Sequence, residues 1–105
     1  MIKMTAITFS QFVTDCFTRD QGKLAREKLL EAIENDPKEE RVTISLAGVD
    51  TMTPSFVDEC FGKLLLQMGS SCFRNRISFA DANETIIALL NAVLSKRAKE
   101  VPSTL

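Results

Sequence analysis

Residues with reactive side chains are sparse in this chain of 105 residues, and their types exclude most catalytic arrangements. The chain has no histidine, so neither a Ser-His-Asp or Cys-His site nor a zinc site with imidazole ligands can form within it. Cys16, Cys60 and Cys72 are odd in number and far apart, which fits neither a disulfide framework nor a metal site. We therefore predict no catalytic residue, no metal and no cofactor.

Ser55, Asp58 and Glu59 are the polar residues whose spacing could still support chemistry, because all three fall near the start of a predicted helix over residues 54–68. A phosphate on Ser55 would meet free backbone N–H groups and the positive end of the helix dipole. Serine is also common in first turns without any further role. Asp58 and Glu59 could act as an acid–base pair, but carboxylates stabilised by the same dipole are the simpler interpretation.

The elements that must position these residues follow from periodicity and from helix-ending residues. Strands are predicted over residues 3–9, 41–46 and 76–79. A short helix is expected to follow Ser10, and a second helix should run to about Asn35 after an interruption at Asp20 and Gly22. Thr53 and Pro54 are a typical helix start. A last helix is expected after a cap at Asp81, and a loose tail is expected to follow that helix.

Alternating strands and helices predict an α/β fold with a small parallel or mixed sheet of three to four strands and helices packed on it. We expect a single domain over residues 1–105, with an ordered core over about 3–97 and a loose tail over 98–105. Because three strands are few for such a sheet, an edge could be short, covered by the first helix, or shared with a second copy.

The helix over residues 54–68 has one apolar stripe that should face the sheet, and a second face almost opposite. That second face carries Ser55, Glu59, Gly62 and Leu66. A glycine inside a helix costs about 1 kcal/mol relative to alanine, so Gly62 calls for a reason. We expect Leu66 to be exposed and Gly62 to allow close approach of another backbone. These four residues are our predicted partner-binding face, although a chance exposed leucine beside a tolerated glycine would look the same.

At this point the sequence resembles a known family. Residues 46–56, Leu-Ala-Gly-Val-Asp-Thr-Met-Thr-Pro-Ser-Phe, resemble the strand, loop and helix start of STAS domains, and residues 55–64 are similar to the Ser-Phe-x-Asp/Glu-Glu-x-Phe-Gly motif of a bacterial STAS-like family of unknown function. In the related anti-sigma-factor antagonists, a serine at the position of Ser55 is phosphorylated by a partner kinase, which blocks binding. Those proteins usually have Asp-Ser-Ser-Gly where this chain has Thr53-Pro54-Ser55-Phe56. The last strand and helix of a full STAS domain have no counterpart after Leu94, which favours completion of an edge by a second copy.

The resemblance and the residues together predict a non-catalytic regulatory interaction module, switched by phosphorylation of Ser55. Its expected partners are a kinase-like ATPase or regulator and a second copy in a homodimer. The alternative is a domain that binds a nucleotide or small molecule at the helix N-termini around Ser55 and Asn83. A net charge of −1 and the lack of a long apolar run favour a cytoplasmic protein that binds neither nucleic acid nor membranes.

Overall fold

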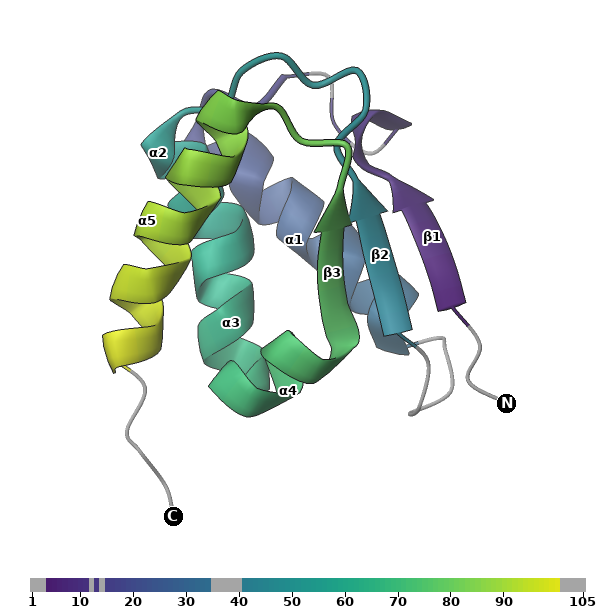
Figure 1. Cartoon of the computed structure of the whole chain (residues 1–105), viewed down its shortest axis with the longest axis vertical. Coiled ribbons are helices and arrows are strands. Elements are labelled where there is room, and N and C mark those ends of the chain that lie inside the picture. Colours follow the sequence, from purple (N-terminus) through teal and green to yellow (C-terminus); the bar gives the residue numbers. More distant parts are fainter. Residues whose placement is uncertain (1–3, 12, 14, 35–40, 101–105) are drawn as a thin grey trace.

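The computed structural model describes residues 4–11, 13, 15–34 and 41–100. Three strands, β1 (Met4–Thr8), β2 (Arg41–Ser45) and β3 (Ile77–Ala80), form a parallel sheet in the order β1-β2-β3. Helix α1 (Arg19–Glu34) connects β1 to β2. Figure 1 shows the sheet with its helices beside it. The predicted α/β class with a small parallel or mixed sheet of three to four strands is therefore confirmed, and the sheet described here is a parallel one of three strands.

The connection from β2 to β3 contains the central helix, residues 54–68, which is made of three consecutive segments. Helix α2 (Pro54–Val57) passes into a π-helical segment η2 (Asp58–Gly62), which passes into α3 (Lys63–Met68). The helix predicted over these residues is thus confirmed, apart from its wider π-helical turns. A short helix α4 (Ser70–Arg76), which the sequence patterns did not indicate, then leads into β3.

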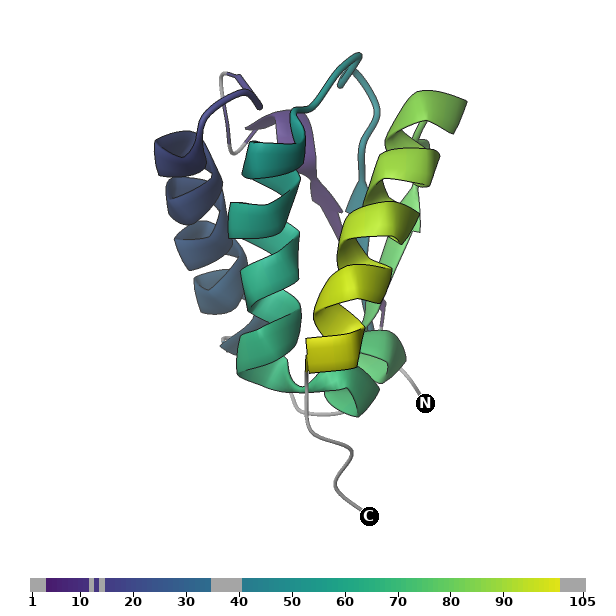
Figure 2. The same cartoon turned by 90° about the vertical axis from the view of Figure 1, so that its left-hand side faces the viewer.

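Helix α1, the central helix and α5 (Glu84–Glu100) lie side by side on one face of the sheet, with the central helix in the middle (Figure 2). Right-handed connections between neighbouring parallel strands in the order 1-2-3 place α1 and the central helix on the same face, and α5, which follows β3, packs against the central helix. The opposite face of the sheet carries small and polar residues such as Ala6, Thr43 and Ser78, which the strand register places next to one another. The fold therefore has two layers.

The core lies between the sheet and the helix layer. Val57, Cys60, Phe61, Leu64 and Leu65 of the central helix are buried there, which confirms the predicted sheet-facing stripe. The ring of Phe61 lies between those of Phe9 and Phe79, with centroid distances of 5.2 and 5.0 Å. Phenylalanine is the aromatic residue of this chain, which has no tryptophan or tyrosine. The contacts of Phe61 therefore place the central helix at the middle of the aromatic part of the core.

Several local predictions need correction. Residues 9–11 form only a short 3-10 turn, η1 (Phe9–Gln11), in place of the predicted helix after Ser10, and Phe17, which follows, is exposed. Helix α1 runs through Asp20 and Gly22 without interruption. Asn83 caps α5, since the amide of Ile86 donates to its Oδ1 at 2.9 Å, whereas Asp81 has a φ of 61° and lies before the helix. The predicted helix end at residues 35–37 and the chain beyond residue 100 lie outside the described residues.

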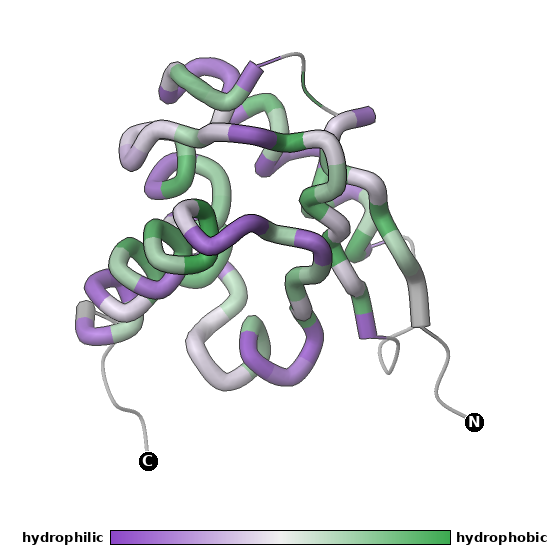
Figure 3. Tube along the Cα trace, turned by 45° about the horizontal axis from the view of Figure 1, so that its top comes forward, coloured by the Kyte–Doolittle hydropathy of each residue, from purple (hydrophilic) through white to green (hydrophobic). Residues whose placement is uncertain are grey.

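Helix α5 is hydrophobic in its first turns and hydrophilic in its last (Figure 3). It continues to Glu100, past the predicted end of the ordered core at residue 97. Its last turns carry Lys96, which is exposed, and Arg97, which is half-buried, and both lie beside the start of the central helix. This position decides the geometry of the candidate site.

Candidate functional site

The central helix starts as its sequence predicts. Thr53 is the N-cap: its Oγ1 accepts a hydrogen bond from the amide of Phe56 at 3.1 Å and donates one to the carbonyl of Phe17 at 2.8 Å. Pro54 occupies the first helical position, where the missing N–H costs nothing. Ser55 follows and is exposed, whereas Phe56 points into the core and packs against Phe9. The first turn thus presents its serine to solvent and its phenylalanine to the core.

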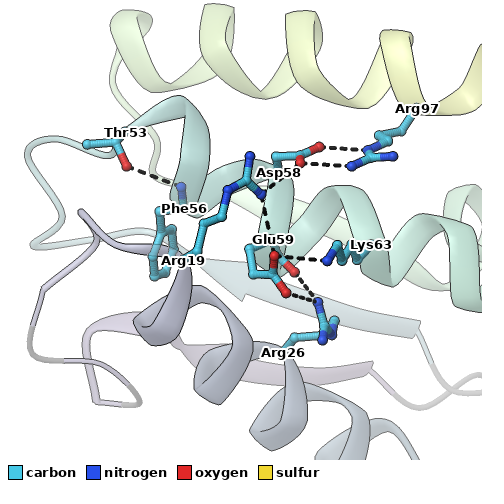
Figure 4. A network of polar contacts seen from close by, with 8 residues as sticks. All are labelled: Arg19, Arg26, Thr53, Phe56, Asp58, Glu59, Lys63 and Arg97. Atoms are coloured by element: carbon cyan, nitrogen blue, oxygen red, sulfur yellow. Dashed lines mark hydrogen bonds and ion pairs between the residues drawn. The ribbon is translucent and has the colours of Figure 1, made fainter.

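Asp58 lies on the flank of the central helix that faces α5. Its two carboxylate oxygens accept hydrogen bonds from the guanidinium of Arg97, Nε to Oδ1 at 2.6 Å and Nη2 to Oδ2 at 2.8 Å. Arg19, at the start of α1, also donates to Oδ2 at 3.1 Å. Asp58 therefore connects all three helices near the start of the central helix (Figure 4).

Glu59 lies on the other flank, facing α1, and is 7% exposed. Arg26 donates to its Oε2 at 3.0 Å and also to its backbone carbonyl. Lys63 lies 3.0 Å and Arg19 3.4 Å from Oε1 (Figure 4). Each carboxylate oxygen thus has a cationic donor, which is what a buried charge requires.

The surroundings of the two carboxylates favour their ionised forms. The hydrogen bond from Arg97 is the main reason that the pKa of Asp58 falls to about 2, with Arg19 adding to the effect against the opposing influence of burial. Burial acts most strongly on Glu59 and would raise its pKa, but the hydrogen bonds from Lys63 and Arg26 outweigh it, so the pKa is lowered. Both groups are anions at neutral pH and have no proton to donate. This favours structural roles over acid–base roles for the pair.

A cleft of about 350 Å³ opens beside Ser55, between the start of the central helix and the last turns of α5. Polar and apolar groups both line its walls, and cations outnumber carboxylates among the charged residues. It is lined by Arg19, Pro54, Ser55, Asp58, Val93, Lys96 and Arg97. Because three of these residues are cationic and one is anionic, the cleft attracts negatively charged groups. We call it the Ser55 cleft.

The four residues of the predicted partner-binding face have different surroundings. Ser55 is exposed, and Leu66 is 36% exposed as expected. Glu59 and Gly62 are buried within the chain, because α1 and α5 cover the flanks of the central helix. A Cβ added at Gly62 would lie 3.1 Å from Cγ of Arg97, so the expected close neighbour of this glycine is α5. In this fold the four residues therefore do not form one continuous exposed face.

Asn83, the second helix start in our alternative prediction, has both ends of its side-chain amide in use. Its Oδ1 accepts from the amide of Ile86 at 2.9 Å, and its Nδ2 donates to the carbonyl of Asp50 at 3.0 Å. These bonds cap α5 and fix the loop after β2, which is a structural role. Asn83 is not among the residues that line the Ser55 cleft, which lies at the start of the central helix.

The cysteines and possible metal ligands offer no chemistry at this site. Cys16 and Cys60 are buried, and burial raises the pKa of the Cys16 thiol to about 11 and also raises the pKa of the Cys60 thiol. Cys72 is exposed on α4. Among the described residues, no group of three histidine, cysteine or carboxylate side chains is placed to hold a metal ion.

The cations around Asp58 and Glu59 are the part of the site that sequence patterns missed. Arg19 and Arg26 come from α1, and Lys96 and Arg97 from α5, at sequence distances of more than 30 residues from the carboxylates. Basic residues in the last turn of a helix are favoured by the helix dipole alone, so their presence in α5 does not indicate contacts with the central helix. A usable signal was the pair of adjacent carboxylates on a helix that otherwise reads as core, because buried carboxylates require cations from neighbouring elements.

The low pKa of Asp58 predicts how stability changes with pH. The folded-state pKa of about 2 lies below the ordinary value of 3.8, so the ion pairs stabilise the fold fully above about pH 5 and lose this effect as the pH falls toward 2. The contribution at neutral pH is about 2 kcal/mol. Asp58→Asn should therefore lower the free energy of unfolding at pH 7 and flatten its decline in acid, as measured by urea denaturation at a series of pH values.

Asp20→Asn is the matched control for this prediction, because Asp20 is an exposed carboxylate in the first turn of α1. It should leave the pH dependence close to that of the wild type. If Asp58→Asn and the wild type lose stability with the same slope between pH 5 and pH 2, the ion pairs with Arg97 and Arg19 do not stabilise the fold as described.

Comparison with known proteins bears on what this arrangement serves. The model of a family described as a STAS-like domain of unknown function matches residues 21–86, from the first turn of α1 to the first turn of α5. No curated protein and no solved structure gives a significant match. Among the described helices, none combines the length and the apolar character that crossing a membrane requires.

Proposed function

This chain belongs to the family of STAS-like domains of unknown function, and from that premise we propose that it is a non-catalytic regulatory module that binds a protein partner at the start of the central helix. Phosphorylation of Ser55 controls this binding. The observation that carries the proposal is the position of Ser55, which is exposed on a largely covered helix and lines a cleft whose walls carry Arg19, Lys96 and Arg97.

The charge of the Ser55 cleft supports a partner with acidic groups. Two arginines form ion pairs with Asp58, and Arg19 is the more exposed of them, with 54% of its side chain accessible against 21% for Arg97. Lys96 is exposed as well. Positive charge at a surface depression steers acidic partners toward it and discriminates against basic ones. A kinase-like ATPase is the partner expected from the resemblance, because it would both bind this turn and phosphorylate it.

Phosphorylation of Ser55 would change the cleft by ordinary electrostatics. A phosphoserine carries about −1.5 to −2 charges at neutral pH, and at a helix N-terminus next to arginines it forms new charge-assisted hydrogen bonds. It would occupy Arg19 and Lys96 from within the chain and withdraw them from an acidic partner. Because Phe56 is fully buried, its side chain does not obstruct access of an enzyme to Ser55.

The other three residues of the predicted partner-binding face contribute to this proposal in different ways. Leu66 is exposed farther along the central helix, beyond the buried Glu59 and Gly62, and offers a separate apolar contact. Glu59 contributes from beneath, because it accepts a hydrogen bond from Arg19 at 3.4 Å and helps to hold that guanidinium in the cleft. Gly62 allows α5 to approach, which brings Arg97 to the wall.

Ser55→Glu and Arg19→Glu test the proposal, because each adds negative charge to the cleft. We expect recovery of the bound partner from cells of the native host to fall at least about tenfold with either variant, as quantified by mass spectrometry of affinity-purified samples. Wild-type protein from the same cells should include a species heavier by about 80 Da, one phosphate, which is absent from Ser55→Ala.

Lys23→Glu is the matched control, since Lys23 is an exposed cation of α1 that does not line the cleft. It should bind as the wild type does. Equal recovery with Ser55→Glu, Arg19→Glu and Lys23→Glu would remove the Ser55 cleft as the binding surface. Absence of the heavier species under all growth conditions would remove the phosphorylation switch and leave the binding proposal to the recovery experiment.

A further inference from the structure

Strand β3 has an open edge. It pairs with β2 on one side, and no described strand lies on its other side. The carbonyl of Ala80 points toward β2, where it accepts a hydrogen bond from the amide of Leu46 at 2.8 Å. Because backbone groups alternate in direction along a strand, Ile77 and Phe79 direct their N–H and C=O groups toward the open edge. Such an edge is a template for another strand.

An apolar groove runs along this edge. Helix α5 packs mainly on the central helix rather than on β3, which leaves two adjoining hollows of about 310 and 380 Å³ between α5 and the strand. Both hollows are lined by Phe79, Asn91 and Leu94. Leu65 and Phe73 also line the hollow beside the start of β3. We call the two hollows together the β3 groove.

Ile87 projects beside the groove. It is 47% exposed and lines the hollow near the end of β3, in the apolar first turns of α5 (Figure 3). A projecting apolar side chain at one end of a groove and an open apolar hollow at the other form a self-complementary pair. A two-fold axis across the groove would place Ile87 of each copy beside the hollow at the start of β3 in the other.

The charges at the two ends of β3 also favour a second copy in the antiparallel direction. Arg74 and Arg76 precede the strand, and Asp81 follows it. In an antiparallel pair of β3 strands, the basic start of each strand lies next to the acidic end of the other. A parallel pair would place like charges together, which is unfavourable.

We propose that the edge of β3 and the β3 groove are the surface through which two copies of this chain associate. The two β3 strands pair antiparallel around a two-fold axis at Ser78, so that the three strands of each copy form one continuous sheet. In this register Ile77 of each copy exchanges backbone hydrogen bonds with Phe79 of the other. The surface lies on the flank of α5 opposite the Ser55 cleft, so association leaves Ser55 accessible. The proposal does not depend on the proposed function.

Lysine substitutions on α5 test the surface. The wild type should have the mass of a dimer by light scattering at about 100 µM, whereas the double variant Ile87→Lys/Asn91→Lys should have the mass of a monomer, because it places like charges across the two-fold axis and weakens association at least about 100-fold. Ala88→Lys/Ala92→Lys is the matched control, since both alanines are exposed on α5 and do not line the groove. It should remain a dimer.

An engineered disulfide tests the position of the two-fold axis. This test does not require the lysine variants to fold. Ser78 has no backbone group directed to the open edge, and non-hydrogen-bonded pairs bring Cα atoms within about 4.5 Å, so Ser78→Cys should form an intermolecular disulfide under mild oxidation. The experiment uses a Cys72→Ser background, because Cys72 is the exposed native cysteine. Ala6→Cys, on β1 at the other edge of the sheet, should not cross-link.

Three outcomes would overturn the proposal. The first is a monomeric wild type at about 100 µM, a concentration at which a weak homodimer is still populated. The second is a dimer that Ile87→Lys/Asn91→Lys and Ala88→Lys/Ala92→Lys affect equally. The third is cross-linking of Ala6→Cys without cross-linking of Ser78→Cys, which would assign association to the β1 edge.

Discussion

Glu59→Gln is expected to lower the free energy of unfolding by about 2–4 kcal/mol, because it removes one charge from a buried ion-pair network and leaves the other charges in place. The side chains of Arg26 and Glu59 are only 11% and 10% exposed, and their closest oxygen–nitrogen distance is 3.0 Å. Without the carboxylate, the guanidinium of Arg26 keeps its hydrogen bond to the backbone carbonyl of Glu59 but loses its counterion. Urea denaturation at neutral pH measures the change.

Glu31→Gln is the matched control, since Glu31 is an exposed carboxylate on α1. Its effect should stay within about 0.5 kcal/mol, as is usual for surface substitutions. If the two variants lose similar stability, Glu59 is solvated in solution rather than buried between α1 and the central helix. A loss confined to Glu59→Gln would show that the network holds these two helices together.

Gly22→Val is expected to lower the free energy of unfolding by about 3 kcal/mol, since α1 and the central helix touch backbone to backbone at this position. A Cβ at Gly22 would lie 2.9 Å from the carbonyl oxygen of Phe56 and 3.3 Å from the amide nitrogen of Cys60. Neither atom can move without displacing the central helix. The same urea measurement gives the size of the effect, and circular dichroism shows whether helix content is kept.

Gly22 and Gly62 both lie inside helices, so the same substitution can be compared at the two positions. Alanine at either position gains about 1 kcal/mol of helix propensity. At Gly62 the nearest atoms are Oδ1 of Asp58 at 3.0 Å and Cγ of Arg97 at 3.1 Å, which belong to side chains that can adjust. Gly62→Ala should therefore be close to neutral, whereas Gly22→Ala should destabilise by about 1–2 kcal/mol. Equal effects would contradict the close approach at Gly22.

Gly22 also shows how far sequence patterns reach. Glycine has low helix propensity, so a helix interruption near Asp20 and Gly22 was a reasonable prediction, and it is wrong. Tertiary packing overrides propensity here, because only a residue without a Cβ lets the two helices approach so closely. Helix propensity describes an isolated helix, whereas at this position the contact between two helices requires glycine.

Glu59 shows the same limit at the candidate site. A helical wheel correctly identifies the stripe that faces the sheet, because burial against a sheet leaves a strong periodic pattern. It cannot show that a central helix is covered on both flanks as well. The burial of Glu59 and Gly62 depends on the side-by-side arrangement of three helices, which topology produces and local periodicity does not reveal.

The sequence by itself determined the α/β class with a small sheet, the start of the central helix at Thr53 and Pro54, the family and the exposure of Leu66, whereas the structure decided that the sheet is purely parallel. The features determined by the sequence depend on local patterns and short motifs, whose residues lie close together in the chain. Only the tertiary structure decided that Arg19, Lys96 and Arg97 gather around Ser55, and that no described strand pairs with the edge of β3 beside the apolar groove. Both results depend on contacts between residues distant in the chain, and such contacts are set by how helices and strands pack rather than by their own sequences.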